Sequence, residues 1–309
     1  MKRNGMAPVM ALALAAALAA AACSGGPAGA GTATLAGAGF PVEVGGTLIP
    51  AAPQRIVSAS ASHTEILYAL GAGSRVVATD QFSNFPPEAA ATPKLDAFNL
   101  GVESAAAFAP DLVVLSYDPG DLRAGLGALG VPTLLFAPPL TLDEAYGQMR
   151  ALGAATGLEA EAEALVTGIE EEVSRLVASV PAREAPLTYY YELDPTLYSL
   201  TSATFVGGLL GLLGLENIAD PADSAGTGYP QLSAEFVLAA DPDLILLADT
   251  RCCGQSPETV ASRPGWDALG AVAGGRVVPL DDDVASRWGP RLVDLVAAVA
   301  GAMAAVGEP

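Results

Sequence analysis

One long proline-free stretch, Leu158–Val180, constrains the fold more than any other part of the sequence. Its apolar residues recur every three or four positions, which places them on one face of an α-helix. They are Leu165, Ile169, Val173, Leu176, Val177 and Val180, and the other face carries Glu159, Glu161, Glu163, Glu170, Glu171, Glu172 and Arg175. A helix of this length spans about 35 Å at ~1.5 Å per residue, roughly the width of a small domain. We therefore predict that residues 158–180 connect two lobes, residues 51–157 and residues 181–309; one more helix packed on a single sheet is the alternative.

Both flanking segments alternate short apolar strands with helical runs, which is typical of α/β folds with parallel sheets. In the first segment we predict strands at 54–60, 75–78, 110–115 and 132–136, and helices at 66–70, 102–108, 122–129 and 142–153. In the second we predict strands at 186–193, 241–247 and 276–280, and helices at 204–213, 232–239 and 291–306. The predicted fold class is α/β, with two Rossmann-like lobes whose mostly parallel sheets are joined by one long backbone helix.

The charge balance limits the kinds of partner. Acidic residues outnumber basic ones by 34 to 14, which gives a net charge of −20 at pH 7. Nucleic-acid binding needs clustered Lys and Arg that replace counterions, and docking on an anionic membrane surface also needs positive charge. The composition therefore disfavours both, while the hydrophobic content of 51% supports a sizeable core.

The N-terminus has the pattern of a signal peptide over residues 1–22. Lys2 and Arg3 precede an apolar run, Met10–Ala22, that is too short to span a bilayer. No later run is long, apolar and uninterrupted enough for a second membrane span. We therefore expect a protein that works outside the cytoplasm.

The residues around Cys23 resemble a bacterial lipoprotein signal, with cleavage before Cys23 and a lipid on its sulfur. The usual Leu three positions earlier is Ala20 here, and a plain secretory signal is the alternative. Residues 23–50 are rich in Gly, Ala and Thr, which predicts a flexible tether. A lipid anchor at the cell membrane is thus the only membrane contact that we expect.

A short pattern occurs in both predicted lobes. Glu103 starts a predicted helix eight residues before Asp111, which opens a buried strand with Pro before it and Leu after it. Glu235 stands in the same relation to Asp243. A glutamate in the first turn of a helix complements the helix dipole, and this alone would explain either glutamate by itself. The pair suggests two related lobes with equivalent surface carboxylates.

Several segments, taken in order, resemble one known family. They are Thr64–Gly73, Phe85–Ala89, Glu103, Ala109–Val113, Gly214–Ile218, Pro230–Glu235 and Arg287–Arg291. They resemble the helical-backbone (class III) substrate-binding proteins of ABC transporters, which carry ferric siderophores, haem and cobalamin. The resemblance covers the chain from about Pro53 onward, and it implies two lobes that bind a ligand between them with modest hinge motion.

The resemblance also implies partners. In such proteins one surface glutamate per lobe pairs with arginines of the permease dimer, which works with its ATPase, and Glu103 and Glu235 fall on those positions. Exposed ion pairs contribute only ~0–1 kcal/mol each, but several together fix orientation and encounter rate. We expect a monomer that binds a small molecule and no nucleic acid.

The cleft is expected at the carboxyl ends of the strands. Candidate ligand-binding residues in the loops there are Phe82, Phe98, Tyr117, Tyr198, Tyr229, Arg287 and Trp288. Cobalamin-binding relatives have aromatic residues at positions resembling Phe82, Phe98 and Tyr229. Aromatic side chains give broad apolar contact to a planar ligand, although each of these residues alone also fits the edge of a core.

His63 is the single histidine, and it precedes the first predicted helix near the expected cleft. Ligation of haem iron or cobalt, or a hydrogen bond to the ligand, is one interpretation; a capping or solvent-exposed histidine is the other. A binder of bare zinc or manganese needs several His and carboxylate ligands. One histidine therefore argues against a metal site.

Cys252 and Cys253 follow a predicted strand directly. Outside the cytoplasm two free thiols tend to oxidise. Adjacent Cα atoms lie ~3.8 Å apart, below the usual disulfide range of roughly 4.4–6.8 Å, so a vicinal disulfide would be strained and would stiffen a turn. We favour this disulfide over two thiols, and place metal ligation third.

The sequence contains no G-x-S-x-G elbow, no phosphate loop and no dinucleotide fingerprint after a strand, so we predict no enzyme activity and no cofactor. The ligand that we rank first is a ferric siderophore or related iron chelate, followed by cobalamin and then haem. Ferric siderophores are often anionic and need basic residues, for which Arg287 and Arg251 are the candidates. A surface sensor or adhesion lipoprotein on the same fold is the alternative outside this class.

Overall fold

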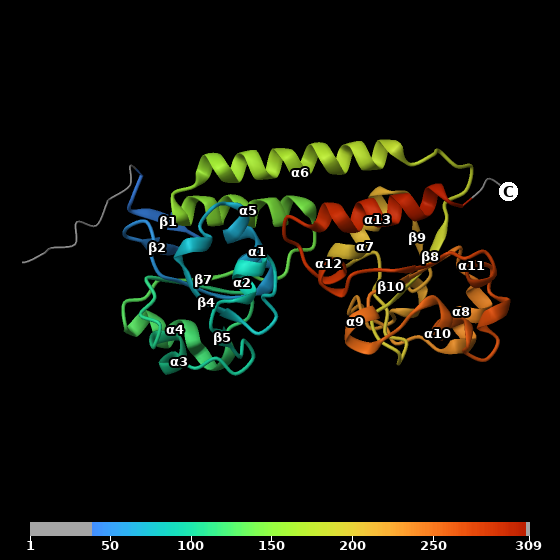
Figure 1. Cartoon of the computed structure of the whole chain (residues 1–309), viewed down its shortest axis with the longest axis horizontal. Helices are drawn as coiled ribbons and strands as arrows, with labels where there is room; N and C mark the ends of the chain where they lie inside the picture. The colour runs from blue at the N-terminus through green and yellow to red at the C-terminus, as the bar shows by residue number, and fades with distance from the viewer. Residues whose placement is uncertain (1–38, 307–309) are drawn as a thin grey trace, which may run out of the picture. The chain divides into compact units, whose positions relative to one another are not determined.

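Two parallel sheets and a long helix dominate the computed structural model, which describes residues 39–306 (Figure 1). These residues all belong to one compact unit. The predicted signal peptide, the lipidation site Cys23 and most of the predicted tether lie outside the described residues. None of the helices within 39–306 has the length and apolar character needed to cross a membrane.

The sheet of the first lobe has five parallel strands in the order β5-β4-β3-β6-β7. The strands are β3 (Ile56–Ala59), β4 (Val76–Asp80), β5 (Lys94–Leu95), β6 (Leu112–Leu115) and β7 (Thr133–Leu135). The helices are α1 (Ala61–Ala69), α2 (Pro87–Ala90), α3 (Val102–Ala106), α4 (Leu122–Ala128) and α5 (Leu142–Thr156). The predicted parallel sheet is confirmed, and the predicted helix 142–153 extends one turn further, to Gly157 in the left-handed conformation.

Both faces of this sheet are covered, because alternate strand residues point to opposite sides. In β6, Leu112 and Val114 join a core with α1 and α5, whereas Val113 and Leu115 join a separate core with α3 and α4. This explains why β6 reads as a continuous apolar run rather than as an alternating one.

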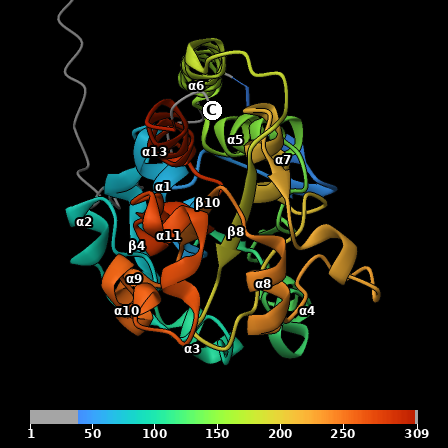
Figure 2. The ribbon, with the colours of Figure 1, turned by 90° about the vertical axis from the view of Figure 1, so that its right-hand side faces the viewer.

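The second lobe repeats the arrangement with four parallel strands in the order β11-β10-β8-β9. They are β8 (Thr188–Glu192), β9 (Glu216–Asn217), β10 (Leu244–Leu247) and β11 (Val277–Pro279). The helices are α7 (Phe205–Leu212), α8 (Ala234–Ala240), α9 (Thr250–Cys253), α10 (Pro257–Ala261), α11 (Gly270–Ala273), α12 (Asp282–Ser286) and α13 (Leu292–Ala304). Helices α7 and α13 pack on one face and α8, α10 and α11 on the other (Figure 2).

The predicted connecting helix is α6 (Glu159–Ser179), one residue shorter at each end than expected. Its buried residues step by four and three: Ala162, Val166, Ile169, Val173 and Leu176. This face packs on α5 of the first lobe and on α13 of the second (Figure 1). One hydrophobic core therefore runs through both lobes beneath α6, which sequence periodicity alone does not reveal.

The prediction of a flexible tether over residues 23–50 is wrong at the C-terminal end of that range. An antiparallel hairpin of β1 (Val42–Val44) and β2 (Thr47–Ile49) is there, with Ile49 fully buried in the shared core. Its turn residues, Gly45 and Gly46, both have positive φ angles, which a two-residue hairpin turn of this kind requires. A Gly-Gly pair between alternating apolar residues was the available signal for this hairpin.

The contact between α5 and α6 depends on Gly153. A Cβ atom at this position would lie 2.4 Å from Cβ of Ala162 and 3.0 Å from the carbonyl oxygen of Leu158. We expect Gly153→Ala to lower the free energy of unfolding by about 1–3 kcal/mol, as overpacking does. Urea denaturation measures this.

Gly147→Ala is the matched control. Gly147 lies on the same helix and is exposed, and a Cβ atom added there would meet no other atom within 4 Å. Here the higher helix propensity of Ala is expected to stabilise by up to ~1 kcal/mol. Equal effects of the two substitutions would contradict the close packing of α5 on α6.

Candidate functional site

A cavity of about 370 Å³, the first chamber, lies where the first-lobe strands β3, β4 and β6 end. The loops after parallel strands meet at one edge of the sheet, which is where ligands of α/β proteins bind. The second lobe contributes two residues of α12 and the two residues that follow this helix. The lining residues are Ala59, Ser60, Ala61, Ser62, Asp80, Phe82, Ala97, Phe98, Ser116, Tyr117, Asp283, Ser286, Arg287 and Trp288.

A second chamber, of about 380 Å³, adjoins the first. Both are lined by Ser286 and Trp288. The other lining residues of the second chamber are Pro138, Pro139, Leu140, Ala203, Thr204, Phe205, Val206, Gly226, Thr227, Gly228 and Tyr229. None of these side chains is charged, so this chamber suits an uncharged part of a ligand.

Besides Trp288, which lines both chambers, the structure places four predicted aromatic residues in the chamber walls. Phe82, Phe98 and Tyr117 line the first chamber and Tyr229 lines the second. Phe82 and Phe98 meet edge to face, with ring centroids 5.9 Å apart. All four side chains are about half exposed or more, which is unusual for large aromatic residues and leaves their faces free for a ligand.

Tyr198 lies elsewhere. It forms an isolated antiparallel bridge with Gln231 and lines neither chamber. Its strand-end position was the reason for the prediction, but the chain after β8 turns back to pair with the segment near Gln231. Tyr198 therefore lies beside the segment that carries Tyr229, although it does not line a chamber itself.

His63 is fully buried, so its prediction as a ligand-binding residue is not supported. Its Nδ1 lies 2.8 Å from Oγ of Ser60 and its Nε2 lies 3.0 Å from Oε1 of Gln148. The ring also packs on Phe136, with centroids 5.2 Å apart. Burial lowers the pKa of His63 to about 4, so the ring is neutral at pH 7 and both nitrogens are occupied.

Arg287 is also buried, with only 8% of its surface exposed. Its Nη1 donates to Oε1 of Glu65 at 2.7 Å and to Oδ1 of Asn84 at 3.0 Å. Its Nη2 donates to the carbonyl oxygen of Phe82 at 2.8 Å and to Oδ1 of Asp283 at 2.5 Å. The guanidinium group is therefore already paired within the protein, although Arg287 also lines the first chamber as predicted.

The partners of Arg287 form an inter-lobe ion cluster, made of Glu65, Asn84, Asp283, Arg287 and Arg291. Glu65 is buried and also accepts two hydrogen bonds from Arg291, at 2.9 and 2.6 Å. The first two residues belong to the first lobe and the other three to the second. Removing one partner of such a buried cluster costs about 3–5 kcal/mol, because a charge is left uncompensated.

Trp288 stands at the junction of the two chambers. Its indole Nε1 donates to Oε1 of Gln148 on α5 at 3.0 Å, and its ring contacts His63 edge to face. The side chain is thus fixed from the first lobe although it belongs to the second. This preorganises the wall that both chambers share.

The charged groups that remain in the first chamber are acidic. Asp80 lines it and is nearly buried, and burial raises the pKa of this carboxyl. Arg251, the other cationic candidate, pairs with Asp281 and Asp283 and lines neither chamber. Within residues 39–306 the two chambers thus have no unpaired cationic side chain.

The two predicted docking carboxylates are both on the surface. Glu103 lies in the first turn of α3 and Glu235 in the first turn of α8, and both are exposed. Each helix packs on the sheet face away from the shared core under α6. The equivalence that the sequence repeat predicts therefore extends to their positions in the two lobes.

The match to known proteins follows this architecture. The model of the periplasmic binding protein family matches residues 56–284. The chain belongs to the periplasmic binding protein family.

Three relatives of this periplasmic binding protein show the range of the family. The uncharacterized ABC transporter substrate-binding lipoprotein YvrC of Bacillus subtilis (strain 168) is 30% identical over 250 residues, 78% of this chain and 77% of that protein. The vitamin B12-binding protein of Pectobacterium carotovorum (strain PC1) is 29% identical over 79% of this chain and 86% of that protein. The periplasmic heme-binding protein RhuT of Roseiflexus sp. RS-1, in apo form, superposes with a TM-score of 0.71 at 27% identity, covering 81% and 97% of the two chains.

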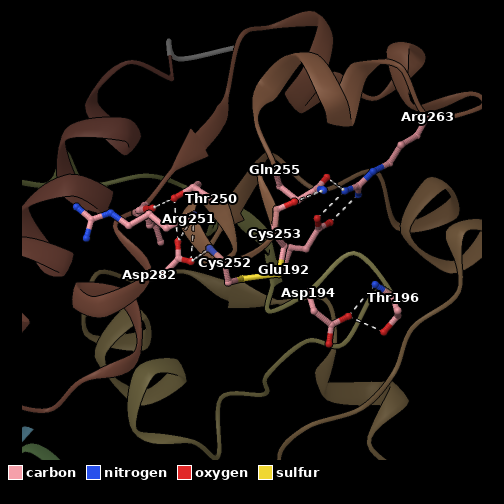
Figure 3. The surroundings of a disulfide bond; sticks show 11 residues. Glu192, Asp194, Thr196, Thr250, Arg251, Cys252, Cys253, Gln255, Arg263 and Asp282 are labelled. Atoms are coloured by element: carbon pink, nitrogen blue, oxygen red, sulfur yellow. Dashed lines mark hydrogen bonds and ion pairs between the residues drawn. A yellow bond between two sulfur atoms is a disulfide. The ribbon is translucent and has the colours of Figure 1, made fainter. Parts of the chain in front are cut away.

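A second polar cluster of the periplasmic binding protein lies at the end of β8 and β10. Glu192 is buried and accepts two hydrogen bonds from Arg263, at 2.6 and 2.5 Å (Figure 3). Asp249 is buried as well, and neither of its carboxyl oxygens has a hydrogen-bond donor. Burial, and then the charge of Glu192, raise the pKa of Asp249 to about 7.

The predicted vicinal disulfide is present beside this cluster, between Cys252 and Cys253 on α9 (Figure 3). Within the described residues, no three His, Cys, Asp or Glu side chains are placed to hold a metal ion.

The raised pKa of Asp249 predicts how stability depends on pH. In the unfolded chain Asp249 has an ordinary carboxyl pKa near 3.9. Between about pH 4 and pH 7 the folded protein therefore holds a proton that the unfolded chain has lost, and the free energy of unfolding falls as pH rises through this window. Asp249→Asn cannot titrate, and its amide can donate to Glu192. We expect this variant to gain stability relative to wild type between pH 5 and pH 8, as measured by urea midpoints.

Asp267→Asn is the control, because Asp267 is exposed and lies in the same lobe. It should keep the pH dependence of the wild type. If Asp249→Asn shows the same pH profile as wild type, the pKa of Asp249 is not raised in the folded protein.

Proposed function

We propose that this periplasmic binding protein captures a corrinoid of the cobalamin type in its two chambers and delivers it to the permease of an ABC importer. The observation that carries the proposal is the chemistry of the chamber walls: exposed aromatic rings, serine hydroxyls and carboxylates, without an unpaired cation among the lining residues. A corrin ring offers a broad face to aromatic side chains and a rim of uncharged amides to hydroxyl and carboxylate acceptors.

The same chemistry lowers the rank of the two other cargoes. From the sequence, ferric siderophores ranked first, with Arg287 and Arg251 as the candidate basic residues for an anionic chelate. Arg287 is already paired within the inter-lobe ion cluster. Haem carries two carboxylates that need cations, and His63 has no free nitrogen for its iron. The similarity to a vitamin B12-binding protein supports a corrinoid as the cargo. Because a heme-binding protein has a similar structure, haem is included in the ligand test.

The ligand test compares cyanocobalamin, haemin and ferric enterobactin by quenching of tryptophan fluorescence and by calorimetry. We expect saturable binding of cyanocobalamin, and about tenfold weaker binding by Tyr229→Ala, because one lost aromatic contact is worth ~1 kcal/mol or slightly more. Tyr198→Ala is the matched control: it removes a similarly exposed tyrosine outside both chambers and should keep the wild-type affinity. If haemin or ferric enterobactin binds more tightly than cyanocobalamin, the proposal of a corrinoid cargo is wrong.

Docking on the permease is assigned to Glu103 and Glu235. The proposal is supported by their exposure at the starts of α3 and α8, one in each lobe, which fits a symmetric permease dimer contacted by a monomer. Attachment to the membrane is assigned to a lipid on Cys23, in line with the lipoprotein name of the Bacillus relative.

The docking test uses the double variant Glu103→Ala, Glu235→Ala in cells that depend on this importer. We expect uptake to be lost while the affinity of the purified protein for its cargo stays unchanged, since neither residue lines a chamber. Glu161→Ala with Glu171→Ala on the exposed face of α6 removes the same charge elsewhere. If the docking variant supports uptake at the level of this control, Glu103 and Glu235 do not contact the permease.

A further inference from the structure

The disulfide between Cys252 and Cys253 is exposed on both residues. It lies on α9, directly after β10, at the same end of the second sheet as the chamber wall α12. Figure 3 shows it between the Asp282 carboxylate on one side and the Glu192–Arg263 ion pair on the other. A thiolate from solution can therefore reach the sulfur atoms without unfolding the lobe.

Cross-linking does not explain this bond. A disulfide stabilises a fold mainly by restricting the loop that it closes in the unfolded chain, and the restriction grows with loop length. Here the sequence separation is one, so the bond closes no loop and joins no distant segments. Its contribution has to come from what it does locally to α9.

The backbone of α9 is held from two sides. The Asp282 carboxylate accepts hydrogen bonds from Oγ1 of Thr250 at 2.8 Å and from the backbone N–H of Cys252 at 2.7 Å. On the other side, Nε2 of Gln255 donates to the carbonyl oxygen of Cys253 at 3.3 Å, and Oε1 of Gln255 accepts from Arg263 at 2.8 Å. The two cysteines thus lie between two hydrogen-bond systems, one of which ends on α12.

The residue after Asp282 links this arrangement to the cargo site. Asp283 lines the first chamber, accepts from Arg287 and Asn84, and pairs with Arg251 of α9. Any change in the position of α9 is therefore transmitted to α12 by two carboxylates that are adjacent in sequence.

We propose that Cys252–Cys253 is a thiol–disulfide exchange site, whose substrate is a small thiol or a protein dithiol outside the cytoplasm, and whose redox state sets the order of α9 and α12. This assignment is independent of which cargo the chambers bind.

The reaction balances with two thiols. A thiolate attacks one sulfur of the pair, the Cys252–Cys253 bond breaks, and the released cysteine thiolate takes a proton from water. A second thiol attacks the mixed disulfide, which leaves two cysteine thiols on the protein and one external disulfide. The protein disulfide gains two electrons and the two external thiols lose them.

The test uses the full chain with Cys23→Ser, which leaves only this pair of cysteines. The native protein is incubated with reduced glutathione or dithiothreitol, alkylated with iodoacetamide and analysed by mass spectrometry, while circular dichroism follows the fold. We expect both cysteines to be alkylated with no change in secondary structure. Alkylation that requires denaturant would overturn the exchange site.

The coupling to α12 is read by amide hydrogen exchange of the oxidised and the reduced protein. We expect amides of Arg251, Cys252 and α12 to exchange at least tenfold faster after reduction, with Leu244–Leu247 of β10 unchanged as the internal reference. The double variant Cys252→Ala, Cys253→Ala should exchange like the reduced protein and ignore added thiol. Equal amide exchange in both redox states would show that the disulfide is not coupled to α12. Whether the disulfide exchanges with thiols is decided separately by the alkylation experiment.

Discussion

The relative position of the two lobes depends on one buried carboxylate, Glu65 of α1. It accepts hydrogen bonds from Arg287 and Arg291, which lie more than two hundred residues later in the chain. Arg287 in turn holds the carbonyl oxygen of Phe82, and Trp288 follows it directly. The ion cluster therefore positions both an aromatic wall of the first chamber and the residue that separates the chambers, so that the cleft is preformed before any cargo arrives.

A shared hydrophobic core complements this polar contact. The buried face of α6 rests on α5 and α13, and the same core extends into both sheets, whereas the outer faces of the sheets have separate cores. With a continuous core and a buried ion cluster between them, the lobes have little freedom to open. Specificity then rests on the chamber walls, where aromatic rings and acceptors remain exposed and the arginine is already neutralised.

Local patterns predicted much of this fold. The spacing of Val166, Ile169, Val173 and their neighbours predicted α6 to within one residue at each end, and apolar runs such as Leu112–Leu115 predicted parallel strands. The site was less predictable, because burial of a polar residue depends on distant partners. Arg287 and Glu65 both lie in segments that carry the family resemblance, but their separation of 222 residues gives no local sign that they pair. His63 is buried and hydrogen-bonded to Ser60 and Gln148, and its pairing with the distant Gln148 could not be read from the residues around it.

The central claim, that cargo binds in the two preformed chambers, is tested most directly by hydrogen exchange with and without saturating cyanocobalamin. The account predicts slower exchange in the loops around residues 80–85, 96–98, 116–118 and 226–229, with α6 unchanged. Protection confined to other surfaces, or protection of α6 with none in these loops, would contradict it.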